Sequence, residues 1–305
     1  MTASDSTLSA VPASAATVGE LLSLLKPRVM TLVVFTGAVG LLLAPGSMHP
    51  FLQLLAIACI ALGSGAGGMI NMWYDQDIDS IMKRTANRPL PAGKVNPDDV
   101  LILGLILSGA SVMMMGLAIN WLAAGILAFA IFFYAVIYTM WLKRSTSHNI
   151  VIGGAAGAFP PAIGWAAMAG NITIEPLILF SIIFLWTPPH FWALALFSNQ
   201  DYQRANIPMM PVKHGAKTTT HQMFGYALAL ALVAISPYFV GMSGVVYLAI
   251  ASVLSGYFAF VCAKMIRQPD NMKLARHVFW YSIIYLFLLF SALLVDSALA
   301  PFIGV

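Results

Sequence analysis

LILGLILSGASVMMMGLAINWLAAGILAFAIFFYAVIYTM, residues 101–140, runs for forty residues without one Asp, Glu, Lys or Arg. A helix needs about 17–25 apolar residues to cross the hydrocarbon core of a bilayer, so this stretch is long enough to cross twice. Asn120 lies at its middle and predicts the turn between spans at 99–119 and 121–140. Because so short a connection cannot recross the membrane, the two spans are predicted to form an antiparallel hairpin.

The rest of the chain has the same apolar character. Of 305 residues, 60% are hydrophobic and 9% are charged, whereas soluble domains average about 25% charged residues. Only helices and closed barrels satisfy their backbone groups in lipid, and these apolar runs are too long for barrel strands. We therefore predict an all-α membrane protein, a bundle of about nine transmembrane helices. The other expected spans are 26–45, 51–72, 149–169, 175–197, 222–242, 245–266 and 278–299.

The positions of the basic residues predict the orientation. With nine spans, all fifteen Lys and Arg residues fall on one side of the membrane, and the loops after the first, third, fifth and seventh spans carry none. The positive-inside rule places that side, with the N-terminus, in the cytoplasm and the C-terminus outside. Residues 1–22 are predicted to be a flexible cytoplasmic tail, because they lack the Lys and Arg of a secretory or mitochondrial signal. Residues 23–305 then form a single transmembrane domain in a bacterial inner membrane.

An acidic segment follows the second span. Asn71, Asp75 and Asp79 are spaced i, i+4 and i+8, which on one helix aligns three oxygen-bearing side chains. Such hard oxygen ligands suit Mg²⁺, which often shares its coordination shell with substrate phosphates. The alternative is a solvated helix end whose acids pair with nearby cations. The cations available to hold phosphate are Lys83, Arg84 and Arg88.

Two further segments end spans on the same side. One carries Asp201 with Arg204 and Lys213, and the other carries Tyr138 with Lys143 and Arg144. An acidic and a basic segment facing each other across a cavity can clamp a diphosphate through a metal ion. The alternative for a lone Tyr or Lys in such a place is an interfacial anchor.

The sixth span, with the sequence WTPPHFW at 186–192, has polar features at membrane depth. Pro188 and Pro189 are expected to break the backbone hydrogen bonds, and an ionisable His190 follows them. On an uninterrupted helix His190 and Asp201 share a face. His190 is expected either to line the cavity, where it contacts the acceptor or moves a proton, or to bond a neighbouring helix. Cys59 and Cys262 are expected to be packing residues.

These motifs resemble a known family. The Asn71-x₃-Asp75-x₃-Asp79 pattern, followed by RPLPAG at 88–93, resembles the first signature of the UbiA-type intramembrane prenyltransferases. The stretches 138–165, 187–193 and 201–211 resemble one branch of that superfamily, the heme O synthases, or protoheme IX farnesyltransferases. The resemblance runs from about Lys26 to the last span. It implies a helical bundle around a cavity that faces the cytoplasm, and Mg²⁺-dependent farnesyl transfer.

The resemblance also implies roles for the polar residues. Asn71, Asp75 and Asp79 would hold Mg²⁺ on the diphosphate with Asp201 opposite. Lys83, Arg88, Lys143 and Arg204 would neutralise the departing diphosphate. The chain departs from the superfamily pattern twice. Asp201 is followed by Ala205 in place of a second Asp-x₃-Asp pair, and the Tyr-x₃-Lys element becomes Tyr138-x₄-Lys143.

By the same resemblance the substrates are farnesyl diphosphate and a vinyl group of heme b, which is a substrate and not a fixed cofactor. The protein is also expected to contact membrane lipid and, as protein partners, heme A synthase or terminal-oxidase assembly proteins. No nucleic-acid partner is expected. Alternatives are a prenyltransferase with an aromatic quinone-precursor acceptor, a transporter, and a non-catalytic oxidase assembly factor. A transporter is disfavoured because Glu175 and Asp296 are the only charges in the outer loops. Aromatic residues expected to line the cavity are Trp73, Tyr138, Trp186, Phe191 and Trp192, and all of these except Tyr138 are expected to shield an allylic cation.

Overall fold

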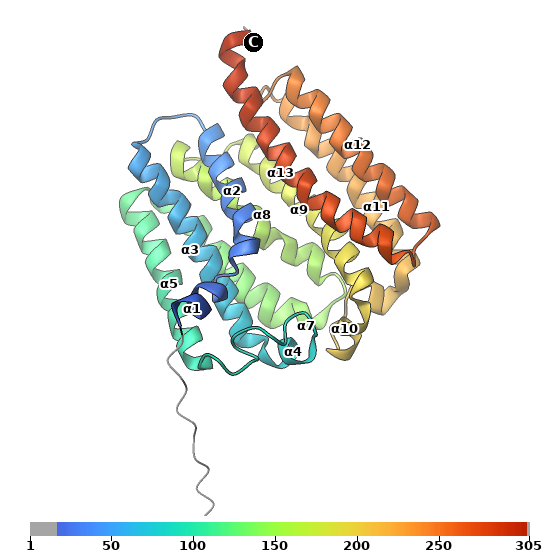
Figure 1. Cartoon of the computed structure of the whole chain (residues 1–305). Coiled ribbons are helices and arrows are strands. Elements are labelled where there is room, and N and C mark those ends of the chain that lie inside the picture. Colours follow the sequence, from blue (N-terminus) through green and yellow to red (C-terminus); the bar gives the residue numbers. More distant parts are fainter. Residues whose placement is uncertain (1–16, 304–305) are drawn as a thin grey trace, which may run out of the picture.

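A computed structural model describes residues 17–303, and within that range the regular structure is helical throughout. Figure 1 shows the long helices side by side, with α1, α4, α7 and α10 at one end of the bundle and the C-terminus at the other. We call the first of these the polar end. The elements are α1 (Val18–Leu24), α2 (Pro27–Leu43), α3 (Pro50–Tyr74), α4 (Gln76–Ile81), α5 (Pro97–Ala118), α6 (Trp121–Phe132), η1 (Phe133–Leu142), α7 (Lys143–Ser145), α8 (Asn149–Ala169), α9 (Ile174–Phe197), α10 (Asn199–Arg204), α11 (Met210–Phe239), α12 (Val245–Arg267) and α13 (Met272–Ile303).

The membrane spans agree with those expected from hydropathy. Eight segments in the described range are long and apolar enough to cross a bilayer, and the apolar part of α2, Val29–Leu43, is a shorter ninth. These segments confirm a multi-pass helical membrane protein. The largest difference in position is α11, which begins at Met210 instead of near residue 222. Gly215, with φ 77°, interrupts it and lets the chain turn where a side chain would be strained.

The N-terminal boundary differs from the expected one. Residues 1–16 of the predicted tail lie outside the described range, but α1 already occupies Val18–Leu24, so the boundary at residue 22 is corrected to the start of this helix. Thr17 and Glu20 form a capping box, in which each side chain accepts from the other residue's backbone N–H. Leu24 is fully buried against α3 neighbours such as Met69. This contact fixes the approach of the chain to α2.

The sixth predicted span, 175–197, corresponds to helix α9 (Ile174–Phe197). Helix α9 runs through Pro188 and Pro189 and ends at Phe197. Proline is tolerated in transmembrane helices because neighbouring helices and side chains satisfy the carbonyl groups that it leaves free. Since α10 is a separate helix beginning at Asn199, His190 and Asp201 do not lie on one uninterrupted helix.

The buried residues form two principal clusters. One joins α9, α11, α12 and α13 and contains Cys262, and the other joins α3, α5, α6 and α8 and contains Cys59. Both cysteines are free and buried, which confirms them as packing residues. Helix α2 packs on α8 at very short range, because a side chain at Gly40 would overlap the Pro161 backbone and one at Gly164 would overlap Gly37. Small residues commonly allow such close approach between membrane helices.

Asp296 is a structural acid at the end opposite the polar end. It lies on α13 and is 6% exposed, and its carboxylate accepts from the backbone N–H groups of Gly244 and Tyr247 at the start of α12. Asp296→Ala removes this cap, and we expect a loss of about 0.5–2 kcal/mol in the free energy of unfolding. Thermal unfolding measures the loss, and the activity of the folded protein should be unchanged. A stability equal to wild type would contradict the capping role.

Candidate active site

The acidic segment is broken at its centre. Helix α3 ends at Tyr74, Asp75 caps it by donating its N–H to the Asn71 carbonyl, and α4 begins at Gln76. The expectation that Asn71, Asp75 and Asp79 lie along one continuous helix is therefore wrong. The three residues remain neighbours because the Asp79 N–H donates to the Asp75 carbonyl at 2.8 Å. The break occurs where the chain leaves the apolar part of the bundle.

Asn71 is held by three side chains. Its Nδ2 donates to Asp75 Oδ2 at 2.7 Å and to Thr139 Oγ1 at 3.1 Å, and its Oδ1 accepts from Lys26 Nζ at 2.9 Å. Because Lys can only donate, this network fixes which amide atom faces the cation. The Asn71 oxygen is thereby directed toward the positively charged side of the cluster.

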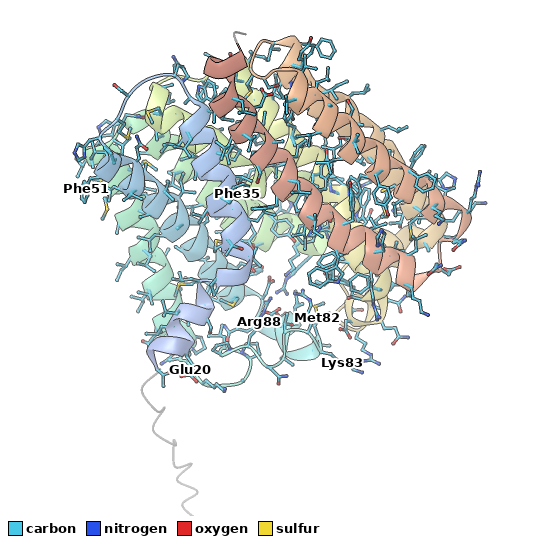
Figure 2. All side chains as sticks on the ribbon, turned by 45° about the horizontal axis from the view of Figure 1, so that its top comes forward. Glu20, Phe35, Phe51, Met82, Lys83 and Arg88 are labelled. Carbon is cyan, nitrogen blue, oxygen red and sulfur yellow. The ribbon has the colours of Figure 1, made fainter. Side chains whose placement is uncertain are left out.

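Each of the two buried carboxylates has a cationic partner. Asp75, 1% exposed, contacts Lys143 Nζ and lies 3.5 Å from Arg144 Nη2. Asp79, 4% exposed, accepts from Arg88 Nη1 at 2.6 Å. Burial of unpaired carboxylates would cost several kcal/mol each, so the paired cations offset that cost. Arg88 lies with Met82 and Lys83 at the polar end (Figure 2).

Lys26 is a site residue that the sequence did not indicate. It was expected only to set topology, yet it contacts Asn71 and lines the main cavity. Its backbone is left-handed, with φ 53°, in the short link between α1 and α2. A lysine rarely adopts this conformation, and such local strain is often found at functional sites. A single Lys before a proline offers no sequence signal that would have distinguished it from a topology determinant.

A ten-residue π-helix explains the extra residue in the Tyr138-x₄-Lys143 element. Between Phe133 and Leu142 the backbone follows i→i+5 hydrogen bonding, and the Lys143 N–H donates to the Tyr138 carbonyl. Each turn therefore takes about one residue more than an α-helical turn. Residues five apart in this segment stack as residues four apart do in an α-helix. The longer spacing thus leaves Lys143 one turn beyond Tyr138, in contact with Asp75.

Thr139 connects this π-helix to the acidic segment. Its side chain is fully buried, donates to the Tyr134 carbonyl at 2.7 Å and accepts from Asn71. Thr139→Val keeps the shape but removes the acceptor, so Asn71 loses one of the bonds that orient it. We expect the activity to fall by roughly tenfold, the equivalent of about 1.4 kcal/mol. Thr139→Ser should restore activity, and a Thr139→Val enzyme with wild-type kinetics would exclude this positioning role.

The main cavity extends from this cluster into the apolar interior. It has a volume of about 670 Å³ and is lined by α2, α3, α6, η1, α8, α9 and α13. Tyr138, Trp186, His190 and Phe191 line it, as expected from sequence. Tyr138 lies so close to Gly153 that a side chain there would overlap its ring. Lys26 lines this otherwise apolar cavity and joins it to the polar cluster through its hydrogen bond to Asn71.

Two of the aromatic residues expected in the cavity lie elsewhere. Trp73 packs against the cluster of α1, α3 and α5 side chains around Leu24. Trp192 is fully buried and packs edge-on against Tyr226 of α11. Both predictions of a cavity contact are wrong. Residues close together on one helix face different neighbours, and only some of these aromatic residues lie on the helix face that borders the cavity.

A smaller hollow of about 330 Å³ contains part of the basic segment. Arg144 and Arg204 line it together with Asp77, which Arg144 binds through both guanidinium nitrogens at 2.8 Å. This interaction holds the pKa of the Asp77 carboxyl below its usual range. Asp77 is exposed and is paired with Arg144 outside the main cavity.

The remaining predicted cations are peripheral in this structure. Lys83, Arg84 and Lys213 are exposed. Burial raises the pKa of Tyr202, on α10, and the nearby positive charge of Arg84 opposes that rise. Asp201 lies on the same short helix and has no contact with Asn71, Asp75 or Asp79 among the described interactions. The structure thus brings Asn71, Asp75 and Lys143 together and pairs Arg88 with the neighbouring Asp79. Asp201 does not join this group.

Known proteins resemble this chain over most of its length. A model of the UbiA prenyltransferase family matches residues 33–284. A protoheme IX farnesyltransferase of Rhizobium johnstonii is 56% identical over 94% of this chain and 92% of its own length. Another of Rhizobium rhizogenes is 58% identical over 91% of this chain and 88% of its own.

Solved structures share the fold at low sequence identity. A structure of digeranylgeranylglyceryl phosphate synthase covers 91% of this chain and 97% of its own, with a TM-score of 0.77 and 20% identity. A UbiA homologue of Archaeoglobus fulgidus, bound to GPP and Mg²⁺, covers 90% and 99%, with a TM-score of 0.66 and 15% identity. The match to the family model, the high identity to curated relatives and the shared helical architecture lead to one conclusion: this chain belongs to the UbiA prenyltransferase family.

Proposed function

We propose that this enzyme transfers the farnesyl group of farnesyl diphosphate to a vinyl group of heme b and depends on Mg²⁺. The observation that carries the proposal is the charged cluster around Asn71 and Asp75 at the end of a deep apolar cavity. A prenyl diphosphate has the same polarity, with an anionic head and a hydrocarbon tail. The names of relatives above 50% identity support heme as the acceptor.

The donor set fits a magnesium ion that shares its shell with substrate. In the described residues no three His, Cys, Asp or Glu side chains come together as a metal site. Asn71, Asp75 and Asp79 nevertheless offer one amide and two carboxylate oxygens, and Mg²⁺ is commonly held by one or two carboxylates together with substrate phosphates. The A. fulgidus homologue with bound GPP and Mg²⁺ supports this interpretation. When bound, Mg²⁺ supplies positive charge that stabilises the departing diphosphate.

The chain's own cations complete the neutralisation. Lys26, Arg88 and Lys143 contact Asn71, Asp79 and Asp75 respectively, and Lys26 also lines the cavity. In the proposed complex these side chains turn from the acids to the diphosphate oxygens. Charge-assisted hydrogen bonds from Lys and Arg stabilise the negative charge that develops as the carbon–oxygen bond breaks.

The cavity protects the reacting carbon. As the C1–O bond of farnesyl diphosphate breaks, C1 becomes an allylic cation and bonds to the terminal vinyl carbon of heme b. Water then adds its oxygen to the inner vinyl carbon and releases one proton, giving a hydroxyethylfarnesyl substituent and diphosphate. Apolar walls keep other water away from the cation, and the faces of Tyr138, Trp186 and Phe191 are available to shield it.

The proposal also assigns the orientation and the biological setting. The polar end carries the basic loops, so it faces the cytoplasm of a bacterial cell, with the C-terminus on the periplasmic side of the inner membrane. The product serves terminal-oxidase assembly, with heme A synthase or oxidase assembly proteins as partners. Asp201 and the cations Lys83, Arg84, Arg144, Arg204 and Lys213 are assigned to capture of the diphosphate at the cavity entrance.

An acceptor comparison tests the proposal. The purified protein in lipid receives farnesyl diphosphate, Mg²⁺ and either heme b or an aromatic quinone precursor, and product mass is measured. Farnesylated, hydroxylated heme as the preferred product supports the proposal. Preferential prenylation of the quinone precursor would overturn the acceptor and keep the family chemistry. A folded sample that prenylates neither would favour an assembly factor.

A large side chain in the cavity should lower kcat/KM for heme and leave the charged cluster in place. A side chain at Gly157 on α8 would meet no atom within 4 Å, and this residue lines the cavity. We expect Gly157→Leu to lower kcat/KM for heme by roughly tenfold or more, since overlap with a bound ring costs at least about 1.4 kcal/mol. Gly109→Leu is the matched control, because Gly109 is exposed on α5 with equally open space. Equal activities of the two variants would contradict the placement of the acceptor.

A further inference from the structure

His190 is clamped on both faces of its ring. Trp186, one turn earlier on α9, stacks on it with ring centroids 4.3 Å apart and planes 16° apart. Phe279 of α13 stacks on it at 4.7 Å and 22°. The imidazole therefore presents its edges, and not its faces, to any ligand. A ring held in this way has little freedom to turn about its Cβ–Cγ bond.

Ser282 determines which ring nitrogen carries the proton. Its single hydroxyl proton is donated to the Phe279 carbonyl at 2.6 Å, which leaves Oγ to accept from His190 Nδ1, also at 2.6 Å. The hydrogen-bond network thus assigns the proton of the neutral ring to Nδ1. Trp186 Nε1 donates to the Ser282 carbonyl at 2.7 Å, so the same residue holds both rings. Ser282 is fully buried.

The other ring nitrogen opens on the cavity. His190 lines the cavity, and no hydrogen bond of its Nε2 occurs within residues 17–303. Nε2 is also not one of the fully buried, unpartnered side-chain atoms in this range, so it is accessible. Its lone pair is therefore available to an occupant of the cavity. Packing alone does not require that one ring nitrogen be fixed by a hydrogen bond while the other is left accessible to the cavity.

We propose that His190 Nε2 is the axial ligand of the heme iron when the acceptor is bound, an inference that rests on the proposed function. Histidines that bind metals almost always donate their other ring N–H to a hydrogen-bond acceptor, which fixes the tautomer and the ring orientation. The Ser282–His190 pair has this arrangement before any ligand arrives. Neutral imidazole is a common proximal ligand of heme iron.

Ligation would orient the acceptor as well as bind it. The porphyrin plane stands across the iron–nitrogen bond, so a rigid imidazole sets the tilt of the macrocycle. Trp186 and Phe279 prevent the imidazole from rotating, and Ser282 keeps its free nitrogen toward the cavity. The vinyl groups at the porphyrin edge are then held at a defined place relative to the charged cluster. His190 is a ligand of the substrate in this account, and Ser282 is a positioning residue.

Optical and EPR spectra of heme b bound to the full-length protein in nanodiscs test the proposal. The wild-type protein is expected to give the spectrum of imidazole-ligated iron, which His190→Ala loses and added imidazole restores. Ser282→Ala should weaken heme binding by roughly ten- to hundredfold, as loss of such outer hydrogen bonds does at metal sites, and Ser282→Thr should restore it. His221→Ala is the control, because His221 is exposed on α11 and bonds its own helix.

The outcomes separate this inference from the proposed function. If heme binds to His190→Ala with the wild-type ligation spectrum, the iron ligand lies elsewhere and the inference is overturned. If the wild-type protein makes farnesylated heme without imidazole ligation, the inference fails while the proposed function stands. If the wild-type protein neither binds heme nor farnesylates it but prenylates another acceptor, both fail. Loss of ligation in His190→Ala with farnesyl diphosphate binding intact supports the inference.

Discussion

Asp75→Asn is expected to reduce farnesyl transfer by about 10²–10³-fold, the effect of removing one electrostatic stabiliser from an active site. Asp75 is the most connected acid of the site, with contacts to Asn71, Lys143 and Arg144. Asn keeps the shape but removes the charge that would hold Mg²⁺ on the diphosphate. Diphosphate release and the Mg²⁺ concentration for half-maximal rate are the measurements.

Asp77→Asn is the matched control for that change. Asp77 lies two residues away, is exposed and pairs with Arg144 outside the main cavity. Its loss should change the rate by less than about threefold, since exposed ion pairs contribute about 0–1 kcal/mol. Near-normal diphosphate release by Asp75→Asn, or equal losses in the two variants, would show that the metal assignment is wrong.

Lys143→Met is expected to have the second-largest effect, again about 10²-fold or more in kcat. Met keeps an unbranched side chain but cannot neutralise diphosphate. The change also leaves Asp75 without its shortest ionic contact, and breaking a buried pair costs about 3–5 kcal/mol of stability. A rate measured on the folded fraction separates the catalytic loss from unfolding.

The double variant Asp75→Asn, Lys143→Met distinguishes the two roles. Since it removes both charges, it should recover much of the stability that Lys143→Met loses, while transfer stays at least as slow as in the single variants. Lys217→Met, an exposed lysine on α11, serves as the control. Recovery of transfer in the double variant would mean that Lys143 acts only by balancing Asp75, and the proposed contact with diphosphate would be withdrawn.

The transmembrane architecture was predictable because the bilayer imposes one simple requirement. A span must be long and apolar, so hydropathy located the helices within a few residues, apart from the start of α11. The segment before that span is rich in polar residues, which predict a loop. In the structure it is a short helical segment that joins the span at Gly215. The backbone conformation of such a segment depends on tertiary contacts that cannot be read from the sequence.

The charged cluster was predictable only in part. The spacing of Asn71 and Asp75 brought them together as expected, because i and i+4 residues meet even at the end of a helix. The break at Asp75 was not predictable from that pattern. Lys26 and Thr139 reach the site from other helices, and the π-helix that aligns Lys143 has no periodic signature in the sequence. Tertiary contacts decided all three.

The most direct test of the account is an assay of the purified protein in lipid with heme b, farnesyl diphosphate and Mg²⁺, following product mass and diphosphate release together. The account predicts a farnesylated, hydroxylated heme, formed in step with diphosphate and abolished by EDTA. Product formation that persists at full rate in EDTA would contradict the role given to Asn71, Asp75 and Asp79. Diphosphate release without any heme product would contradict the acceptor.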